Sequence, residues 1–91
     1  IAVMLPLNGP LAAAAGAVRD GLMTAYYSAL SQGYPVPEIL FYDSSSDDII
    51  NLYNQATSAG AQLIIGPLDK DQGKRLASTN ALPAPTLALH Y

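Results

Sequence analysis

Residues 1–20, IAVMLPLNGPLAAAAGAVRD, contain a short apolar run, a turn and the beginning of a helical pattern. The run Ile1–Leu5 has no polar residue, which is typical of a strand buried on both faces of a parallel sheet. Pro6 ends this strand because proline cannot donate a hydrogen bond to a sheet, whereas Pro10 suits the first turn of a helix. A strand, a tight loop and a helix in this order predict the opening of a βαβ unit.

The rest of the chain repeats this alternation. Apolar residues at alternating spacings of four and three define the inner face of the first helix: Leu11, Ala15, Val18, Leu22, Tyr26 and Ala29. The expected helices are residues 11–31, 47–59 and 70–79, and the expected strands are residues 1–5, 39–42, 62–65 and 86–89. We therefore expect an α/β fold, an open parallel sheet in the order 2-1-3-4 with flanking helices and right-handed crossovers.

This strand order places the first helix on one face of the sheet and the other two helices on the opposite face. One helix cannot cover four strands. The third and fourth strands should therefore be exposed on the side of the first helix, or be covered there by another segment or chain.

Two of the predicted helix ends carry recognisable caps. Gly60 follows the second helix, where a residue with left-handed backbone commonly ends a helix and glycine adopts that conformation without strain. Asp69 with Gln72 three residues later resembles a capping box for the third helix.

Acidic residues surround the start of the second helix. Asp43 and the serines at 44–46 predict a loop, and Asp47 and Asp48 then fall in the first helical turn, where carboxylates interact favourably with the helix dipole. The alternative is that Asp43, Asp47 and Asp48 form a metal-binding cluster, which is the less common role for such residues.

The composition bounds the possible functions. The chain has 91 residues, which is one domain at most, and it begins within a strand, so we expect part of a larger domain. Hydrophobic residues make up 51% and charged residues only 12%, which suggests that some of the surface is normally covered. A net charge of −3 without a basic run argues against a nucleic-acid partner. No apolar run approaches the ~18 residues of a membrane span.

Familiar catalytic and cofactor motifs are missing from the sequence. There is no G-x-G-x-x-G, no G-x-S-x-G, and no phosphate-binding G-x-x-x-x-G-K-[ST], since Gly73-Lys74 is followed by Arg75. One histidine and no cysteine leave no set of nitrogen or sulfur metal ligands. We therefore expect no catalytic residue, no cofactor and no metal.

Two loops follow strands that the predicted order makes neighbours. They are Leu7–Pro10 after the first strand and Gly66–Asp69 after the third, and their helices leave on opposite faces. Such a switch point is where open α/β sheets bind ligands. The candidate cleft residues are Asn8, Gly9, Pro10, Gly66, Pro67, Leu68 and Asp69, with His90 just past the last strand. The alternative is that both loops are only tight turns and that His90 is a polar loop residue.

Basic and aromatic residues mark two further surfaces. Lys70, Lys74 and Arg75 form either an anion-binding patch or, with the acidic residues of the same helix, a solvated face. Tyr27 and Tyr34 lie off the inner face of the first helix and are candidates for a protein interface, whereas Tyr26, Tyr42 and Tyr53 fit the edge of the core.

Several segments resemble a known family. IAVMLPLNGPLAAAAGAVRDG, FYDSSSD, GAQLIIGPLDKD and PTLALH look like the first half of a type I periplasmic-binding-protein lobe. More closely, YDSSS, GAQLIIGPL-x-K and LAL resemble the C-terminal domain of the LppC-type lipoprotein family of penicillin-binding protein activators, over nearly the whole chain.

The resemblance implies a periplasmic lipoprotein anchored in the outer membrane by a lipid outside this chain. Its implied partner is a bifunctional peptidoglycan synthase, whose transpeptidase activity it stimulates in cell-wall synthesis and cell-shape maintenance. It implies no catalysis. It also implies that the chain is part of a two-lobed domain whose second lobe lies outside this sequence.

The alternative is a solute-binding receptor of an ABC transporter for amino acids or similar small molecules. In such receptors the residues after Gly-Pro usually include serine or threonine, which hold the ligand carboxylate. Here the residues at 68–71 are Leu, Asp, Lys and Asp, without a hydroxyl. Asp69 would repel a carboxylate unless Lys70 neutralises it.

Overall fold

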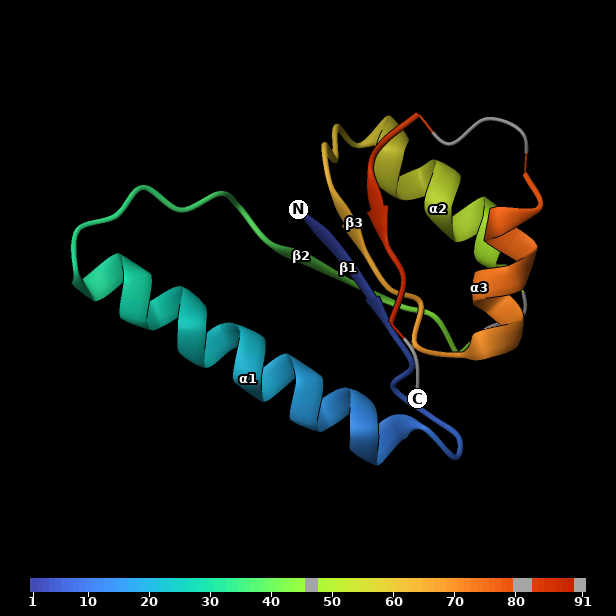
Figure 1. The fold of residues 1–91 in the computed structure, drawn as a ribbon, viewed down its shortest axis with the longest axis horizontal. Helices are drawn as coiled ribbons and strands as arrows, with labels where there is room; N and C mark the ends of the chain where they lie inside the picture. The colour runs from blue at the N-terminus through green and yellow to red at the C-terminus, as the bar shows by residue number, and fades with distance from the viewer. Residues whose placement is uncertain (46–47, 80–82, 90–91) are drawn as a thin grey trace.

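The computed structural model describes residues 1–45, 48–79 and 83–89. Strands and helices alternate along the chain: β1 (Ala2–Leu5), α1 (Ala12–Ser31), β2 (Leu40–Asp43), α2 (Ile49–Ser58), β3 (Ile64–Ile65), α3 (Lys70–Ala77) and β4 (Thr86–Leu87). The strands form one parallel sheet in the order β2-β1-β3-β4 (Figure 1). The predicted α/β fold and strand order are therefore confirmed.

Several element boundaries differ from the prediction. α1 begins at Ala12, because the turn through Gly9 and Pro10 closes with a hydrogen bond from the Ala12 amide to the Gly9 carbonyl. β3 and β4 contain only two residues each, fewer than predicted. Hydrogen bonds from Ala2 to Leu63 and from Gly66 to Leu87 extend the pairing of β3 by one residue at either end.

Strand β1 lies between β2 and β3, and all four of its residues are buried, as the unbroken apolar run predicts. Its side chains alternate between two core clusters. Ala2 and Met4 join the cluster on the side of α2 and α3, and Val3 and Leu5 join the cluster on the side of α1. A single strand therefore supplies both halves of the core.

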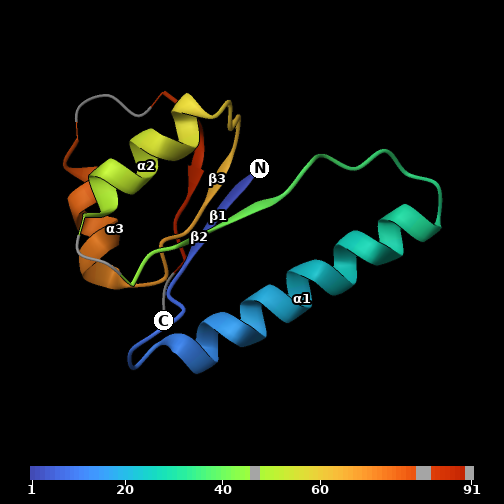
Figure 2. The ribbon, with the colours of Figure 1, turned by 180° about the vertical axis from the view of Figure 1, so that it is seen from behind.

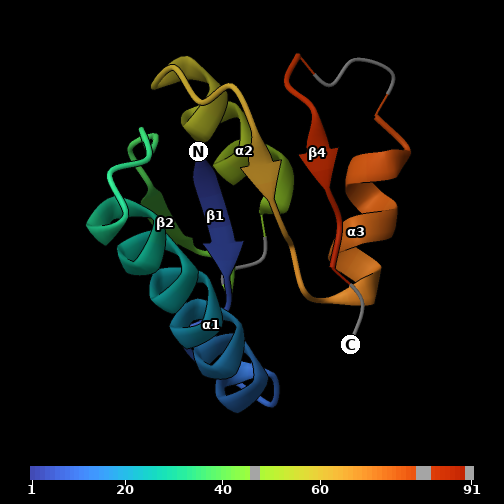
Figure 3. The ribbon, with the colours of Figure 1, turned by 60° about the vertical axis from the view of Figure 1, so that its left-hand side comes forward.

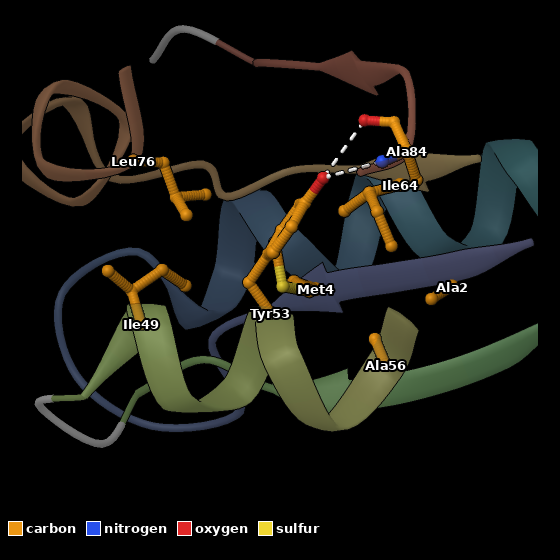
Figure 4. Close-up of a cluster of buried hydrophobic side chains, with 8 residues drawn as sticks. All are labelled: Ala2, Met4, Ile49, Tyr53, Ala56, Ile64, Leu76 and Ala84. Carbon is orange, nitrogen blue, oxygen red and sulfur yellow. Dashed lines mark hydrogen bonds between the residues drawn. The ribbon is translucent and has the colours of Figure 1, made fainter. Parts of the chain in front are cut away.

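The cluster on the α2 side is organised around Tyr53 (Figure 4). Its ring is buried beside Met4 and Ile64, and its hydroxyl donates to the Ala84 carbonyl at 2.9 Å and accepts from the Ala84 amide at 3.2 Å. The Thr86 hydroxyl also lies within hydrogen-bond distance, at 3.2 Å. A buried hydroxyl with these partners avoids the penalty of an unpaired polar group and ties α2 to β4.

The two faces of the sheet are covered unequally. α2 and α3 lie on one face, and α1 lies on the other beside β1 and β2, leaving β3 and β4 uncovered on that side (Figure 3). Val3, Ile65 and Leu87 are register partners across that face, and Leu87 at its end is 56% exposed. The predicted exposure is confirmed at Leu87 of β4, whereas Ile65 of β3 is half-buried against the core cluster on the side of α1.

Helix α1 runs past the edge of the sheet, so that its second half projects away from the core (Figures 1 and 2). Of its residues only Ala15 is fully buried, and the rest of the predicted inner stripe is half-buried. Tyr27 in this half and Tyr34 just past its end are each 61% exposed, as predicted for off-core positions. None of the described helices is long and apolar enough to cross a bilayer.

Caps end α2 and begin α3 as the sequence indicated. Gly60 has a φ of 98°, its amide donates to the Thr57 carbonyl, and the next amide donates to the Ala56 carbonyl. This arrangement is the glycine-terminated Schellman motif. The Asp69 carboxylate caps α3 by accepting from the Asp71 amide at 2.8 Å. Gln72, the expected partner in a capping box, donates from Nε2 to the Ser44 carbonyl.

We predict that Gly60→Ala lowers the free energy of unfolding by about 1 kcal/mol or more, because alanine is strained at positive φ. An added Cβ would meet no atom there, so the cost is conformational alone. Gly66→Ala should cost more, since Gly66 has a φ of 106° and its added Cβ would collide with the Met4 carbonyl oxygen. Urea unfolding of both variants measures the two free energies of unfolding. A Gly60→Ala variant as stable as the wild type would contradict the assignment of Gly60 as the cap.

Candidate functional site

A pocket of about 400 Å³ opens at the carboxyl ends of β1 and β2 and the start of α3. Three segments line it: the loop after β1, the loop after β2 and the first turns of α3. Its residues are Pro6, Asn8, Gly9, Pro10, Leu11, Ser44, Ser45, Asp69, Asp71, Gln72 and Arg75. The pocket therefore lies at the predicted switch point of the sheet.

The predicted cleft residues divide into two groups. Asn8, Gly9, Pro10 and Asp69 line the pocket. Gly66, Pro67 and Leu68 do not line it, because the chain turns inward after β3. Leu68 is buried in the α1-side core with Val3 and Leu5, and Pro67 is fully buried. His90 lies outside the described residues.

The loop after β2 contributes two serines, Ser44 and Ser45, which the sequence predicted only as part of a loop leading to a helix. Ser44 is 1% exposed, its amide donates to the Leu5 carbonyl at 3.0 Å, and its carbonyl accepts from Gln72 Nε2 at 2.8 Å. No described residue pairs with its hydroxyl. The predicted strand order could have indicated that these serines line the pocket. β2 is the other neighbour of β1, and both strands end at the same edge of the sheet.

Asp43 connects the loops after β1 and β2. Its Oδ1 accepts from the Leu7 amide at 3.0 Å, from the Ser45 amide at 2.9 Å and from the Ser45 hydroxyl. The hydrogen bond from the Ser45 hydroxyl, followed by those from the Leu7 and Ser45 amides, lowers the pKa of the Asp43 carboxyl below its ordinary value. Asp43 therefore holds the rim of the pocket.

The other acidic residues have separate roles. Asp48 is the N-cap of α2, outside its first turn, and accepts from the Asn51 amide at 2.9 Å. Asp47 lies outside the described residues. Within residues 1–45, 48–79 and 83–89 no group of three or more histidine, cysteine or acidic side chains is placed to hold a metal ion.

The charges at the pocket are mixed. Asp69, Asp71 and Arg75 line it, whereas Lys70 and Lys74 are exposed on α3 and do not. The three basic residues therefore do not converge on the pocket as one anion-binding patch. The start of α3 is also occupied, because Asp69 accepts from its Asp71 amide.

The comparison with known families covers the whole chain. Residues 1–91 match the family model described as "LppC putative lipoprotein". The chain belongs to the LppC family. This confirms the resemblance drawn from the segments YDSSS, GAQLIIGPL-x-K and LAL.

Curated relatives of this LppC chain share one name. The chain is 28% identical over 90 residues to "Penicillin-binding protein activator LpoA" of Photobacterium profundum, and the match covers 99% of the chain and 14% of the relative. It is 43% identical over 63 residues to the protein of that name from Pectobacterium parmentieri, covering 69% of the chain and 9% of the relative. The chain thus spans only a small part of these relatives. No solved structure matches it.

We predict that the Asp43 carboxylate stabilises the fold at neutral pH. Because its pKa is lowered in the folded state, this contribution is present above the pKa of the unfolded chain and is lost as the pH falls through the folded pKa. Asp43→Asn should therefore be less stable than the wild type at pH 7, and the difference should shrink below about pH 4. Urea unfolding of both proteins at several pH values measures this difference in stability. The same difference at pH 7 and at pH 3 would contradict the stabilising role of the Asp43 carboxylate.

We also predict that the intact protein does not bind ordinary α-amino acids with micromolar affinity. Such affinity is about −8 kcal/mol, which a small ligand reaches only if nearly every polar group is paired. Pro6 and Pro10 have no N–H, and Asp69 and Asp71 outnumber Arg75 at the pocket. Isothermal titration with a panel of amino acids tests this, and one micromolar binder would favour the transport-receptor alternative.

Proposed function

We propose that this chain is part of a periplasmic lipoprotein that binds a bifunctional peptidoglycan synthase and stimulates its transpeptidase activity in cell-wall synthesis. The observation that carries the proposal is the LppC family match over residues 1–91. The shared name of the curated relatives, penicillin-binding protein activator, supports the same role. In this proposal a lipid outside the chain anchors the protein to the outer membrane.

The proposed role is regulatory and includes no chemistry by the chain itself. Nucleophilic catalysis needs a nucleophile activated by a base, most often a histidine. The sequence holds one histidine and no cysteine, and none of the familiar catalytic motifs. A regulator acts instead through the surface that it presents to its partner.

The transport-receptor alternative has less support. Its expected ligand-binding residues after β3 are here Leu68, which is buried in the core, and Asp69, which caps α3. Neither can offer a hydroxyl to a ligand carboxylate. The named relatives are activators of penicillin-binding proteins, which also favours the regulatory role.

We propose the projecting half of α1, with the turn that follows it, as the surface that contacts the synthase. Tyr27, Leu30 and Tyr34, at spacings of three and four, are 61%, 51% and 61% exposed. The Tyr27 ring is supported by an edge-to-face contact with Tyr26 at 5.6 Å. No charged residue occurs between positions 21 and 37. Exposed aromatic groups in an uncharged setting are typical of the centre of a protein interface.

The experiment is a pull-down of the periplasmic domains of bifunctional peptidoglycan synthases with the intact protein. We expect the wild type to capture a synthase, and the variant with Tyr27→Ala and Tyr34→Ala to bind it about tenfold or more weakly, as for removal of central aromatic contacts. Gln55→Ala, at an exposed position of α2, is the matched surface control and should bind normally.

The outcomes separate the two parts of the proposal. If the wild type captures no synthase, the proposed function is wrong. If the wild type and the double tyrosine variant bind equally well, the function holds and the assignment of the α1 surface is wrong.

A further inference from the structure

The edge of the sheet at β2 has no strand beside it. β2 ends the strand order, and no described residue forms a strand on the side of β2 away from β1. The Leu40 amide donates inward, to the Ile1 carbonyl at 2.9 Å. Because successive residues of a strand direct their backbone groups to opposite sides, the amide and carbonyl groups of Phe41 and Asp43 point away from the sheet.

This edge lacks the usual protection against pairing with another chain. Natural sheet edges commonly carry lysine or proline, or are covered by a helix or a loop. β2 contains neither residue, and its apolar side chains Leu40 and Phe41 are 45% and 38% exposed. Outward backbone groups beside exposed apolar side chains allow an extended segment of another protein to add as a strand.

An apolar hollow of about 240 Å³ lies against the same edge. Its lining residues come from β1 and the loop after it, from α1 and from β2: Leu5, Leu7, Arg19, Phe41, Tyr42 and Asp43. Leu7 is 64% exposed although it is large and apolar. A side chain of an added strand that enters this hollow would bury both Leu7 and Phe41, which favours association.

The charges at the hollow indicate the chemistry of the partner. The Arg19 guanidinium lies over the Phe41 ring, 5.6 Å from its centroid, and no described carboxylate pairs with it. The Asp43 carboxylate already accepts hydrogen bonds from Leu7 and Ser45. Arg19 is therefore the charge that is left for a partner, and a complementary segment carries an acidic residue next to an apolar one.

The hollow is continuous with the α1 surface proposed for the synthase. Arg19, Met23, Tyr27 and Leu30 follow one another at spacings of four, four and three, which places them on one face of α1. The stripe begins at Arg19 over Phe41 of β2 and ends in the projecting half of the helix (Figure 1). One partner can therefore contact both surfaces together.

We propose that the synthase adds an extended segment to the open edge of β2 as a further strand, with an apolar side chain in the hollow and a neighbouring carboxylate on Arg19. This inference rests on the proposed function, because it names the way in which the same partner is held. Backbone pairing along β2 then supplements the aromatic contacts of α1.

The first test is a quantitative binding assay of the intact protein with the periplasmic domains of a bifunctional synthase. It compares Phe41→Ala with Phe41→Pro, since both variants lose the ring but only proline loses the outward N–H. Proline is tolerated at such an edge position because that N–H takes no part in the pairing with β1. We expect Phe41→Pro to bind about three- to tenfold more weakly than Phe41→Ala, as for the loss of one hydrogen bond.

The charge is tested by Arg19→Glu, which places a carboxylate opposite the one expected on the partner. We expect this variant to bind about tenfold or more weakly than the wild type. Lys70→Glu, the same reversal at an exposed position of α3 outside the hollow, is the matched control and should bind normally. An Arg19→Glu variant that binds as the wild type does would overturn the proposed carboxylate contact.

Hydrogen exchange of the wild type tests the backbone pairing without any substitution, and decides the matter if Phe41→Pro does not fold. The Phe41 and Asp43 amides should exchange about tenfold or more slowly when the synthase is bound. The inference alone is overturned if a captured synthase leaves these rates unchanged, or if folded Phe41→Pro and Phe41→Ala bind equally well. If the wild type captures no synthase, the proposed function fails and this inference fails with it.

Discussion

The burial of β1 is the constraint on which the rest of this structure depends. Its residues are covered on both faces, with Met4 packed against Tyr53 and Ile64 on one side and Val3 against the α1-side cluster on the other. Each fully buried aliphatic side chain stabilises the fold by about 1.5–3 kcal/mol. β2 and β3 pair with opposite sides of β1. The position of β1 therefore determines where the loops after β1, β2 and β3 meet.

The pocket at that meeting point is held together by hydrogen bonds between its loops. Asp43 connects the end of β2 to the loop after β1, and Gln72 connects α3 to Ser44. Gly66 brings the start of the next loop so close to the Met4 carbonyl that no side chain fits there. The polar groups of the rim are therefore anchored to buried strands, as in a small site that is pre-organised on a rigid scaffold.

Two surfaces of this member of the LppC family bear on its proposed function, the projecting half of α1 and the pocket. The projecting half of α1 offers exposed rings and no charge, as an interface with a protein partner requires. The pocket combines the polar side chains of Asn8, Asp69 and Arg75 with the apolar side chains of Pro6, Pro10 and Leu11.

The sequence alone determined the order of the elements, the strand order and the cap at Gly60. The elements and the cap depend on local chemistry: an unbroken apolar run, a helical spacing, or a backbone conformation that glycine adopts most easily. The strand order was expected from the alternation of strands and helices. The position of Asn8 and Asp69 at the switch point followed from that topology. The tertiary structure alone decided that Ser44 lines the pocket while Gly66, Pro67 and Leu68 are buried behind it. These outcomes depend on which side chains meet across neighbouring strands, and contacts between residues as distant in sequence as Ser44 and Gln72 leave no periodic pattern in the chain.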